Sequence, residues 1–178
     1  MTGVPAFERE LRTPRLRGEP LASEHEDTLV QLLLDPRVHA TLWHWSTPPT
    51  CEDVRAALNE AIEHWQRHGF GLWLLREADT GDPVGRGGLQ YTDALAGEFA
   101  VEVAWTISPA LWGRGLATEL AQGAVKAGFE QLGLTELVAL TLADNHASRR
   151  VMEKTGFVYE RAIVHVGLEH VVYRRSRC

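Results

Sequence analysis

A glycine-bearing turn between a predicted strand and a predicted helix is the part of this sequence best suited to bind a ligand. Residues 105–119 read Trp-Thr-Ile-Ser-Pro-Ala-Leu-Trp-Gly-Arg-Gly-Leu-Ala-Thr-Glu, with an apolar strand, a turn at Ser108 and Pro109, and Gly113 and Gly115 opening a helix. Glycine lets backbone N–H groups approach a ligand closely, and a helix N-terminus favours negative charge. The turn therefore predicts a pyrophosphate site.

Two common phosphate-binding signatures fit this turn poorly. A Walker loop requires a lysine after its last glycine, and none follows Gly115. The dinucleotide-binding fingerprint requires a third glycine where this chain has Thr118, and it belongs near the start of its fold. A nucleotide-dependent enzyme is therefore the weaker alternative.

A second polar motif begins one predicted helix and one predicted strand after the turn. It reads Asn-His-Ala-Ser-Arg-Arg-Val-Met-Glu-Lys-Thr-Gly-Phe over residues 145–157. Asn145 at the start of this motif is suited to cap a short helix, because its side-chain oxygen can accept from a backbone N–H. Ser148 would then lie in the first turn of that helix.

The two motifs together resemble the GNAT N-acetyltransferase superfamily and, within it, the RimJ/RimL-type branch. The acetyl-CoA loop of that superfamily has Arg or Gln three residues before its first glycine, whereas this chain has Ala110 there and keeps both glycines. The opening Thr-Pro-Arg-Leu of residues 13–16 is also similar to that branch. The resemblance covers residues 11–175 and implies an α/β (α+β) GNAT fold. Such a fold has a mixed, mostly antiparallel sheet of about seven strands, flanking helices and a splayed acetyl-CoA cleft.

The resemblance implies a donor site built on the turn and on the strand before it. Backbone groups of that strand are expected to pair with the pantetheine arm, and one N–H there would polarise the thioester carbonyl. The pyrophosphate is expected on the amides of residues 113–117, and Trp112 and Arg114 keep packing and solvated-loop roles as alternatives. The predicted donor-binding residues are Trp105, Thr106, Ile107, Trp112, Gly113, Arg114, Gly115, Leu116, Ala117, Thr118 and Asn145.

Transfer of an acetyl group from a thioester to an amine requires a base and an acid but no metal. Many members of the superfamily use a tyrosine as the acid at the position that holds Met152 here, so the resemblance points to Ser148, with a surface serine as the alternative. Glu102 occupies the position of a glutamate in the branch and is the predicted base. It could equally bind a cationic substrate or accept a structural hydrogen bond. Strand alternation places Glu102, Ala104 and Thr106 on one face.

A catalytically inactive acyl-CoA-binding or sensor domain is the alternative function. Met152 and Ala110 favour it, because each replaces a residue that active relatives commonly use. The intact glycines and Ser148 favour the enzyme.

The acceptor is expected to be the primary amine of a small molecule or of a protein N-terminus, and a homodimer stays open. In the superfamily the loop that holds Trp43 and Trp45 borders the acceptor cleft, so these aromatic residues predict an acceptor wall, with core packing as the alternative. His64 and His68 lie one helical turn apart without a metalloprotease glutamate between them, which predicts a solvated helix face and no metal site.

The composition bounds the partners and the compartment. The net charge of −6 disfavours nucleic acid and anionic membranes as partners, whereas acidic groups near a cleft would attract a cationic amine. Cys51 and Cys178 form no paired motif, which suits a reducing compartment. Residues 1–17 carry no signal-like apolar segment and no run could span a bilayer, so a cytoplasmic protein with one domain over residues 1–178 is expected.

The remaining pattern predicts the elements that position these motifs. Helices are expected over residues 23–34, 50–68, 116–132 and 145–154. Strands are expected over residues 15–21, 71–77, 84–92, 99–107 and 137–142, followed by a hairpin over 157–175 that turns near Gly167. Because one helix joins strand 99–107 to strand 137–142, these two strands are expected to be parallel.

Overall fold

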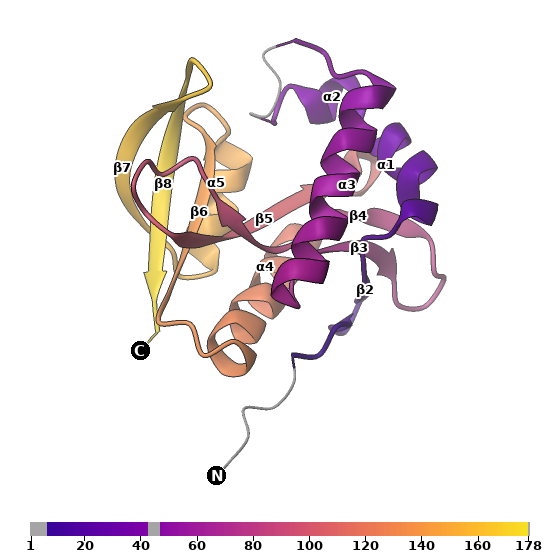
Figure 1. The fold of residues 1–178 in the computed structure, drawn as a ribbon, viewed down its shortest axis with the longest axis horizontal. Coiled ribbons are helices and arrows are strands. Elements are labelled where there is room, and N and C mark those ends of the chain that lie inside the picture. The colour runs from indigo at the N-terminus through magenta and orange to yellow at the C-terminus, as the bar shows by residue number, and fades with distance from the viewer. Residues whose placement is uncertain (1–6, 43–46, 178) are drawn as a thin grey trace.

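The structure is a computed structural model that describes residues 7–42 and 47–177. An eight-stranded sheet with the order β1-β2-β3-β4-β5-β6-β8-β7 lies at its centre (Figure 1). The predicted α/β class with a mixed, mostly antiparallel sheet is confirmed. The sheet has one strand more than the seven expected, since a two-residue strand at Leu11–Arg12 pairs with the strand that begins at Leu16.

The observed elements follow the predicted pattern closely. The strands are β1 (Leu11–Arg12), β2 (Leu16–Pro20), β3 (Leu72–Glu77), β4 (Pro83–Thr92), β5 (Ala100–Ile107), β6 (Glu136–Leu142), β7 (Val158–His165) and β8 (Leu168–Ser176). The α-helices are α1 (Glu26–Leu33), α2 (Pro36–His39), α3 (Cys51–His68), α4 (Leu116–Lys126) and α5 (His146–Lys154). A π-helical turn, Ala127–Gln131, continues α4 and completes the helix expected to reach residue 132.

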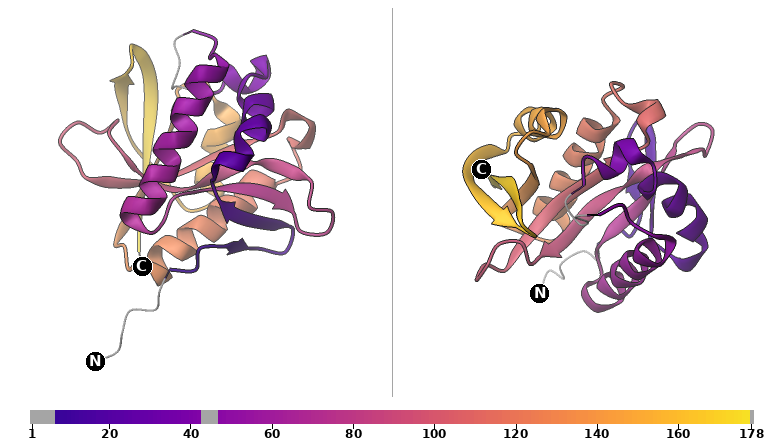
Figure 2. Two further views of the ribbon diagram at one scale, coloured as in Figure 1. Left: turned by 45° about the vertical axis from the view of Figure 1, so that its right-hand side comes forward. Right: turned by 90° about the horizontal axis from the view of Figure 1, so that it is seen from above.

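Helices cover both faces of the sheet (Figure 2). Helix α3 lies across one face together with α1 and α2, whereas α4 and α5 lie on the other. Helix α3 begins with the expected capping box, in which Thr50 and Asp53 satisfy each other's backbone N–H groups, and it ends at Gly69 in the left-handed conformation. No helix of the described residues is long and apolar enough to cross a membrane.

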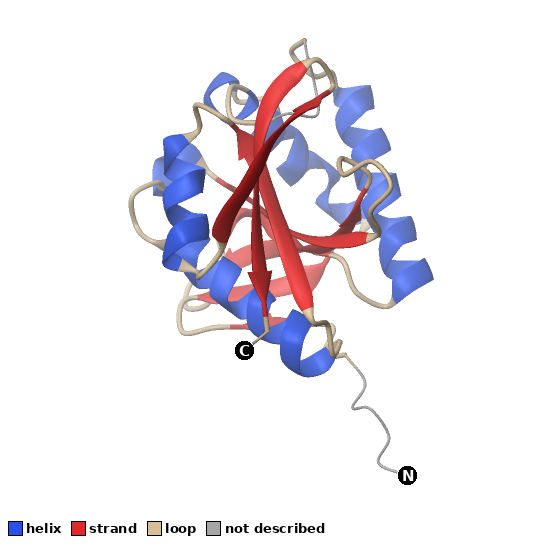
Figure 3. Ribbon diagram, turned by 90° about the vertical axis from the view of Figure 1, so that its left-hand side faces the viewer, coloured by secondary structure: helices blue, strands red, loops and turns tan. Residues whose placement is uncertain are grey.

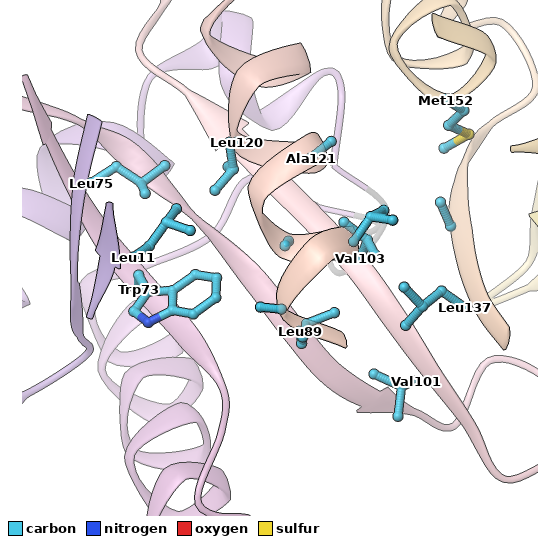
Figure 4. Packing of buried hydrophobic residues seen from close by; sticks show 14 of the residues in the cluster. Leu11, Trp73, Leu75, Leu89, Val101, Val103, Leu120, Ala121, Leu137 and Met152 are labelled. Atoms are coloured by element: carbon cyan, nitrogen blue, oxygen red, sulfur yellow. The ribbon is translucent and has the colours of Figure 1, made fainter. Parts of the chain in front are cut away.

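The side chains of β5 alternate between the two helical layers. Leu120 and Ala121 of α4 belong to one buried cluster with Val101 and Val103 of β5 (Figure 4). Ala104 instead packs against the cluster under α1 and α3. Glu102, Ala104 and Thr106 therefore share the face that α3 covers, as the alternation predicts.

The last two strands form the predicted hairpin, which lies toward the viewer in Figure 3. Val166 and Gly167 both have positive φ angles, 50° and 76°, as a tight two-residue hairpin turn requires. Strand β8 pairs with β6 along the whole length of β6, and β7 forms the edge of the sheet.

Strands β5 and β6 are parallel, as expected, but they pair at one point. The register joins Glu102 to Val138 and continues no further. Toward Ile107 and Leu142 the two strands diverge, so β5 and β6 no longer pair with each other there. This divergence is the predicted splay in the sheet, and it lies beside Glu102.

Candidate active site

A single cavity of about 830 Å³ is lined by residues from both faces of the sheet. On the α4 side its lining includes the glycine turn and the start of α5. On the α3 side it includes Glu102 and residues of α3. Because β5 and β6 diverge between these two groups of residues, the cavity connects the faces at the splay.

Both glycines of the turn are held in the left-handed conformation. Gly113 has a φ of 79° and Gly115, which is the N-cap of α4, has a φ of 78°. A Cβ placed on Gly113 would meet no atom within 4 Å. The packing of the protein therefore does not require glycine there; the backbone conformation does, and the space beside it stays open for a ligand.

The turn is held in place from two sides. The Trp112 indole donates a 2.7 Å hydrogen bond to the Ile107 carbonyl, which ties the turn to the end of β5. Glu119 of α4 accepts from the Thr13 hydroxyl at 2.6 Å and forms a 2.6 Å ion pair with Arg15. Although partial burial raises the pKa of Glu119, the hydrogen bonds from Thr13 and Arg15 outweigh it and hold this pKa below its ordinary value.

The backbone of β5 has free groups on its β6 edge. The Ser108 N–H bonds the Val84 carbonyl at 2.8 Å, and the β4–β5 register pairs Arg86 with Thr106. Hydrogen-bonded pairs alternate along antiparallel strands, so Thr106 directs its backbone toward β4 whereas Trp105 and Ile107 direct theirs toward β6. We call the backbone groups of Trp105 and Ile107 the free edge of β5; the Ile107 carbonyl on it is the one that Trp112 occupies.

Asn145 caps α5, as the sequence predicts. Its Oδ1 accepts from the Ser148 backbone N–H at 3.1 Å, which leaves the amide Nδ2 for another partner. Ser148 is half-buried and lines the cavity. Arg150 and Lys154 of the same helix also line it, and nothing in the sequence marks either residue beyond a charged helix face.

Met152 stands where many relatives hold a tyrosine acid, and it is a core residue here. Its side chain is fully buried in the cluster that includes Leu120 and Leu137 (Figure 4). It therefore fills volume between α5 and the sheet. No group at this position can donate a proton.

Glu102 is almost completely buried, with 3% of its surface exposed, and it lines the cavity. Gln90 Nε2 donates to its Oε2 at 3.3 Å. Burial raises the pKa of Glu102 to about 7, against the lowering effect of the Gln90 hydrogen bond; Asp93 raises this pKa further and Arg86 lowers it. A carboxylate with a pKa near neutrality is suited to accept a proton.

The cavity-facing side of α3 carries polar residues among alanines. Asp53, Glu60 and His64 line the cavity, although the sequence predicts a solvated helix face at His64. That prediction is wrong for His64, which is half-buried, accepts from the Tyr91 N–H at 3.0 Å and bonds the Phe70 carbonyl at 2.9 Å. Burial lowers its pKa below the ordinary value, which favours the neutral ring. The residues described here contain no group of three or more His, Cys, Asp or Glu that could hold a metal ion.

The structure brings most of the predicted site residues together. Arg114 is the exception among the described residues: it does not line the cavity, and its guanidinium lies 3.5 Å from Glu77. Trp43 and Trp45 lie outside the described residues. The predicted residues that line the cavity are Glu102, Trp105, Thr106, Ile107, Trp112, Gly113, Gly115, Leu116, Ala117, Thr118, Asn145 and Ser148.

Relatives of known sequence point to acetyl transfer. The Aspergillus fumigatus protein named FsC-acetyl coenzyme A-N(2)-transacetylase is 30% identical over 156 residues, which are 84% of this chain and 65% of that protein. The Bacillus subtilis protein named uncharacterized N-acetyltransferase YoaA is 35% identical over 89 residues, 49% of each chain. The chain thus spans just under two-thirds of the first relative and about half of the second.

Solved structures share the fold. A protein described as a GNAT-family acetyltransferase from Bordetella pertussis matches with a TM-score of 0.82 and 24% identity, covering 95% of this chain and 100% of that one. A RimL ribosomal L7/L12 alpha-N-protein acetyltransferase in complex with coenzyme A matches with a TM-score of 0.76 and 18% identity, covering 94% and 97%. The family model described as an acetyltransferase (GNAT) domain matches residues 15–158. With this match spanning the turn, the splay and the α5 cap, the chain belongs to the GNAT family of acetyltransferases.

Proposed function

We propose that this protein transfers an acetyl group directly from acetyl-CoA to a primary amine, either of a small molecule or of a protein N-terminus. The observation that carries the proposal is the continuous cavity, which joins the glycine turn on one face of the sheet to the buried carboxylate of Glu102 on the other. Donor and acceptor can therefore meet at the splay between β5 and β6.

The residues present fit acetyl-CoA. The turn offers backbone amides beside open space at the N-terminus of α4, a suitable site for a pyrophosphate. Arg150 and Lys154 add positive charge on the neighbouring helix. The free edge of β5 can pair with the amide groups of a pantetheine arm, and the Asn145 Nδ2 can donate to the same arm.

The proposed reaction needs one proton removed and one delivered. Acetyl-CoA supplies the activated thioester. Glu102 accepts the proton that the amine loses as its nitrogen bonds to the carbonyl carbon, directly or through water. A backbone N–H of the free edge stabilises the negative charge that develops on the carbonyl oxygen. When the carbon–sulfur bond breaks, the Ser148 hydroxyl donates to the departing thiolate and regains its proton from solvent. Glu102 releases the proton it accepted to solvent, so the products are the amide and CoA thiol.

The motif over residues 145–157 supports placing the chain in the RimJ/RimL-type branch of the family. A protein N-terminus is the acceptor that the RimL description names for that protein, and the name of the Aspergillus relative places the acetyl group on an N(2) nitrogen of FsC. We propose one catalytic domain over residues 1–178 for either acceptor.

A catalytically inactive acyl-CoA-binding domain is the alternative, and buried Met152 favours it. The two functions are separated by measuring CoA thiol release with a panel of amines and peptides, beside acetyl-CoA binding by calorimetry. The enzyme predicts thiol release that depends on the amine and that falls in Glu102→Gln and in Ser148→Ala. Tight binding without release for any amine would establish the sensor. Release unaffected by both substitutions would refute the assigned roles of Glu102 and Ser148.

A further inference from the structure

The α3 side of the cavity contains a buried arginine that bonds no other described residue. Arg86 lies on β4, is 6% exposed and lines the cavity. Among residues 7–42 and 47–177, no hydrogen bond or ion pair involves its guanidinium, and the side chain is open to the cavity. Burial lowers the pKa of Arg86 to about 10, with Glu102 opposing that effect, so the group is charged at neutral pH. A buried charge without a partner is unfavourable unless a ligand completes it.

The strand register fixes the direction of the Arg86 side chain. Arg86 pairs with Leu74 on β3 and with Thr106 on β5, and Leu74 is buried in the cluster under α1 and α3. Residues opposite each other in a sheet share a face, so Arg86 lies on the same face as Glu102. Gln90 pairs with Glu102 and follows Arg86 by four residues. The backbone positions of Arg86 and Glu102 are therefore about 13 Å apart along the strand direction, and their long side chains can reduce the distance between the two charges.

Acidic side chains outnumber basic ones on the α3 side of the cavity. Asp53 and Glu60 of α3 and Glu102 of β5 are acidic, whereas Arg86 is the one Arg or Lys among the described lining residues on the α3 side. The acidic groups suit a ligand with an ammonium group. The planar guanidinium, with its fork of N–H donors, suits a carboxylate in bidentate geometry.

We propose that the acceptor is a primary amine that also carries a carboxylate, with the carboxylate on Arg86 and the amine beside Glu102. The assignment rests on the proposed function, since acetyl transfer is what places the amine near Glu102. A free amino acid and a peptide whose first side chain is acidic both present this chemistry.

The test compares acid and amide forms of the same amine. A series of ω-amino acids of increasing chain length is assayed for CoA thiol release, each beside its carboxamide, and a peptide beginning with aspartate is assayed beside one beginning with asparagine. For the wild type, kcat/KM is expected to favour the acid form by about 10- to 100-fold at the chain length that spans Arg86 and Glu102. The peptide pair shows whether the preferred acceptor is a free amino acid or an acidic N-terminus.

Substitutions at Arg86 assign the preference to this residue. Arg86→Met is expected to abolish the acid preference, so that kcat/KM becomes equal for the acid and the amide, and to keep or raise the melting temperature, because it removes an unpaired buried charge. Arg86→Lys keeps the charge without the fork and is expected to retain part of the preference. Arg67→Met, at an exposed position on α3, is the matched control and is expected to change neither rate.

The outcomes separate this inference from the proposed function. Equal wild-type rates for acid and amide would overturn it, as would an equal loss for both forms in Arg86→Met. If that variant does not fold, the Arg86→Lys panel decides in its place. If no amine releases CoA thiol, acetyl transfer fails, yet thermal stabilisation of the wild type by an amino acid and not by its amide would still support the carboxylate site. The absence of that stabilisation would overturn it.

Discussion

The guanidinium of Arg15 donates a 2.8 Å hydrogen bond from Nη1 to the backbone carbonyl of Arg114. The same guanidinium is paired through Nε with Glu119 on α4, so one side chain joins the residue between the two glycines to the helix that follows. Arg15 is not among the residues that line the cavity. It is a positioning residue for the turn.

Loss of this contact should loosen the turn without unfolding the protein. Arg15→Ala is expected to weaken acetyl-CoA binding by about 3- to 10-fold, because the turn must then be ordered by the ligand. The free energy of unfolding should change by less than about 1 kcal/mol, since the Arg15 side chain is half exposed and Glu119 keeps its hydrogen bond from Thr13. Calorimetric titration and urea unfolding measure the two effects. Arg12→Ala, which removes an exposed pair with Glu10, is the control; an equal effect there would contradict the role of Arg15.

Gly113 should be needed for donor binding more than for folding. In Gly113→Ala the new Cβ meets no protein atom, so the cost to stability is the left-handed backbone strain of about 1 kcal/mol. The methyl group would project into the space offered to the pyrophosphate, and acetyl-CoA affinity is expected to fall about tenfold or more.

Gly97→Ala provides a matched control for that experiment. Gly97 has a φ of 78°, open space around its Cβ position and a place outside the cavity lining. Its substitution should cost similar stability and leave acetyl-CoA affinity unchanged. Equal affinities for the Gly113 and Gly97 variants would show that the turn does not hold the donor.

Asn145 should show two separable roles. Asn145→Asp keeps an oxygen that accepts from the Ser148 N–H, so the stability of α5 should be preserved, whereas Asn145→Ala should cost about 1 kcal/mol. Both variants lack the Nδ2 donor, and both are expected to bind acetyl-CoA about 5- to 10-fold more weakly. Full affinity in Asn145→Asp would limit Asn145 to capping. Thermal unfolding and binding titrations on the same samples give the two readouts.

The rate should depend on the ionisation of Glu102. Because burial raises the pKa of this carboxyl to about 7, kcat/KM is expected to rise as pH increases through about 7, where the base becomes deprotonated. Glu102→Gln should lower kcat by about 100-fold or more and remove this limb of the profile. A Gln variant with the wild-type profile would show that another group is the base.

The same shift predicts a stability change with the opposite pH trend. The folded-state pKa of Glu102 lies above the ordinary value of 4.5, so between those values the folded protein keeps a proton that the unfolded chain has lost. The free energy of unfolding should therefore fall as pH rises from about 4.5 to about 7, by on the order of 1–3 kcal/mol, and then level off. Glu102→Gln should lack this contribution. Urea unfolding at several pH values compares the two proteins; parallel curves would contradict the shift.

The parts of the site predicted from sequence are those set by local structure. The glycine turn needs a backbone conformation that glycine supplies, the Asn145 cap needs one side chain at a helix start, and the shared face of Glu102 and Thr106 follows from strand alternation. Each depends on residues within a few positions of one another. The observed Ser148 bond and the left-handed glycines confirm that local reading.

The parts that were missed depend on what covers a surface. Arg86 stands in the run Val-Gly-Arg-Gly-Gly, and alternation does not tell whether a strand face meets solvent or a helix. The packing of α3 over β4 and β5 buries it. His64 and Glu60 form a polar stripe on α3 that has the same spacing whether it faces water or a polar cavity. A lone arginine between glycines in an otherwise apolar strand is the signal that could have marked the site.

The one-point pairing of β5 with β6 makes the sheet two half-sheets that share a hinge at Glu102 and Val138. Beyond the hinge, a donor whose amides pair with the free edge of β5 would occupy the space between β5 and β6 and hydrogen-bond to the β5 backbone. The proposed donor would thus extend the hydrogen-bond ladder of the sheet. A change in the angle between the half-sheets would break few backbone hydrogen bonds in the empty protein and several in the donor-bound protein. Donor binding should therefore make the sheet more rigid. Slower amide exchange at Trp105 and Ile107 would measure both donor binding and this rigidity.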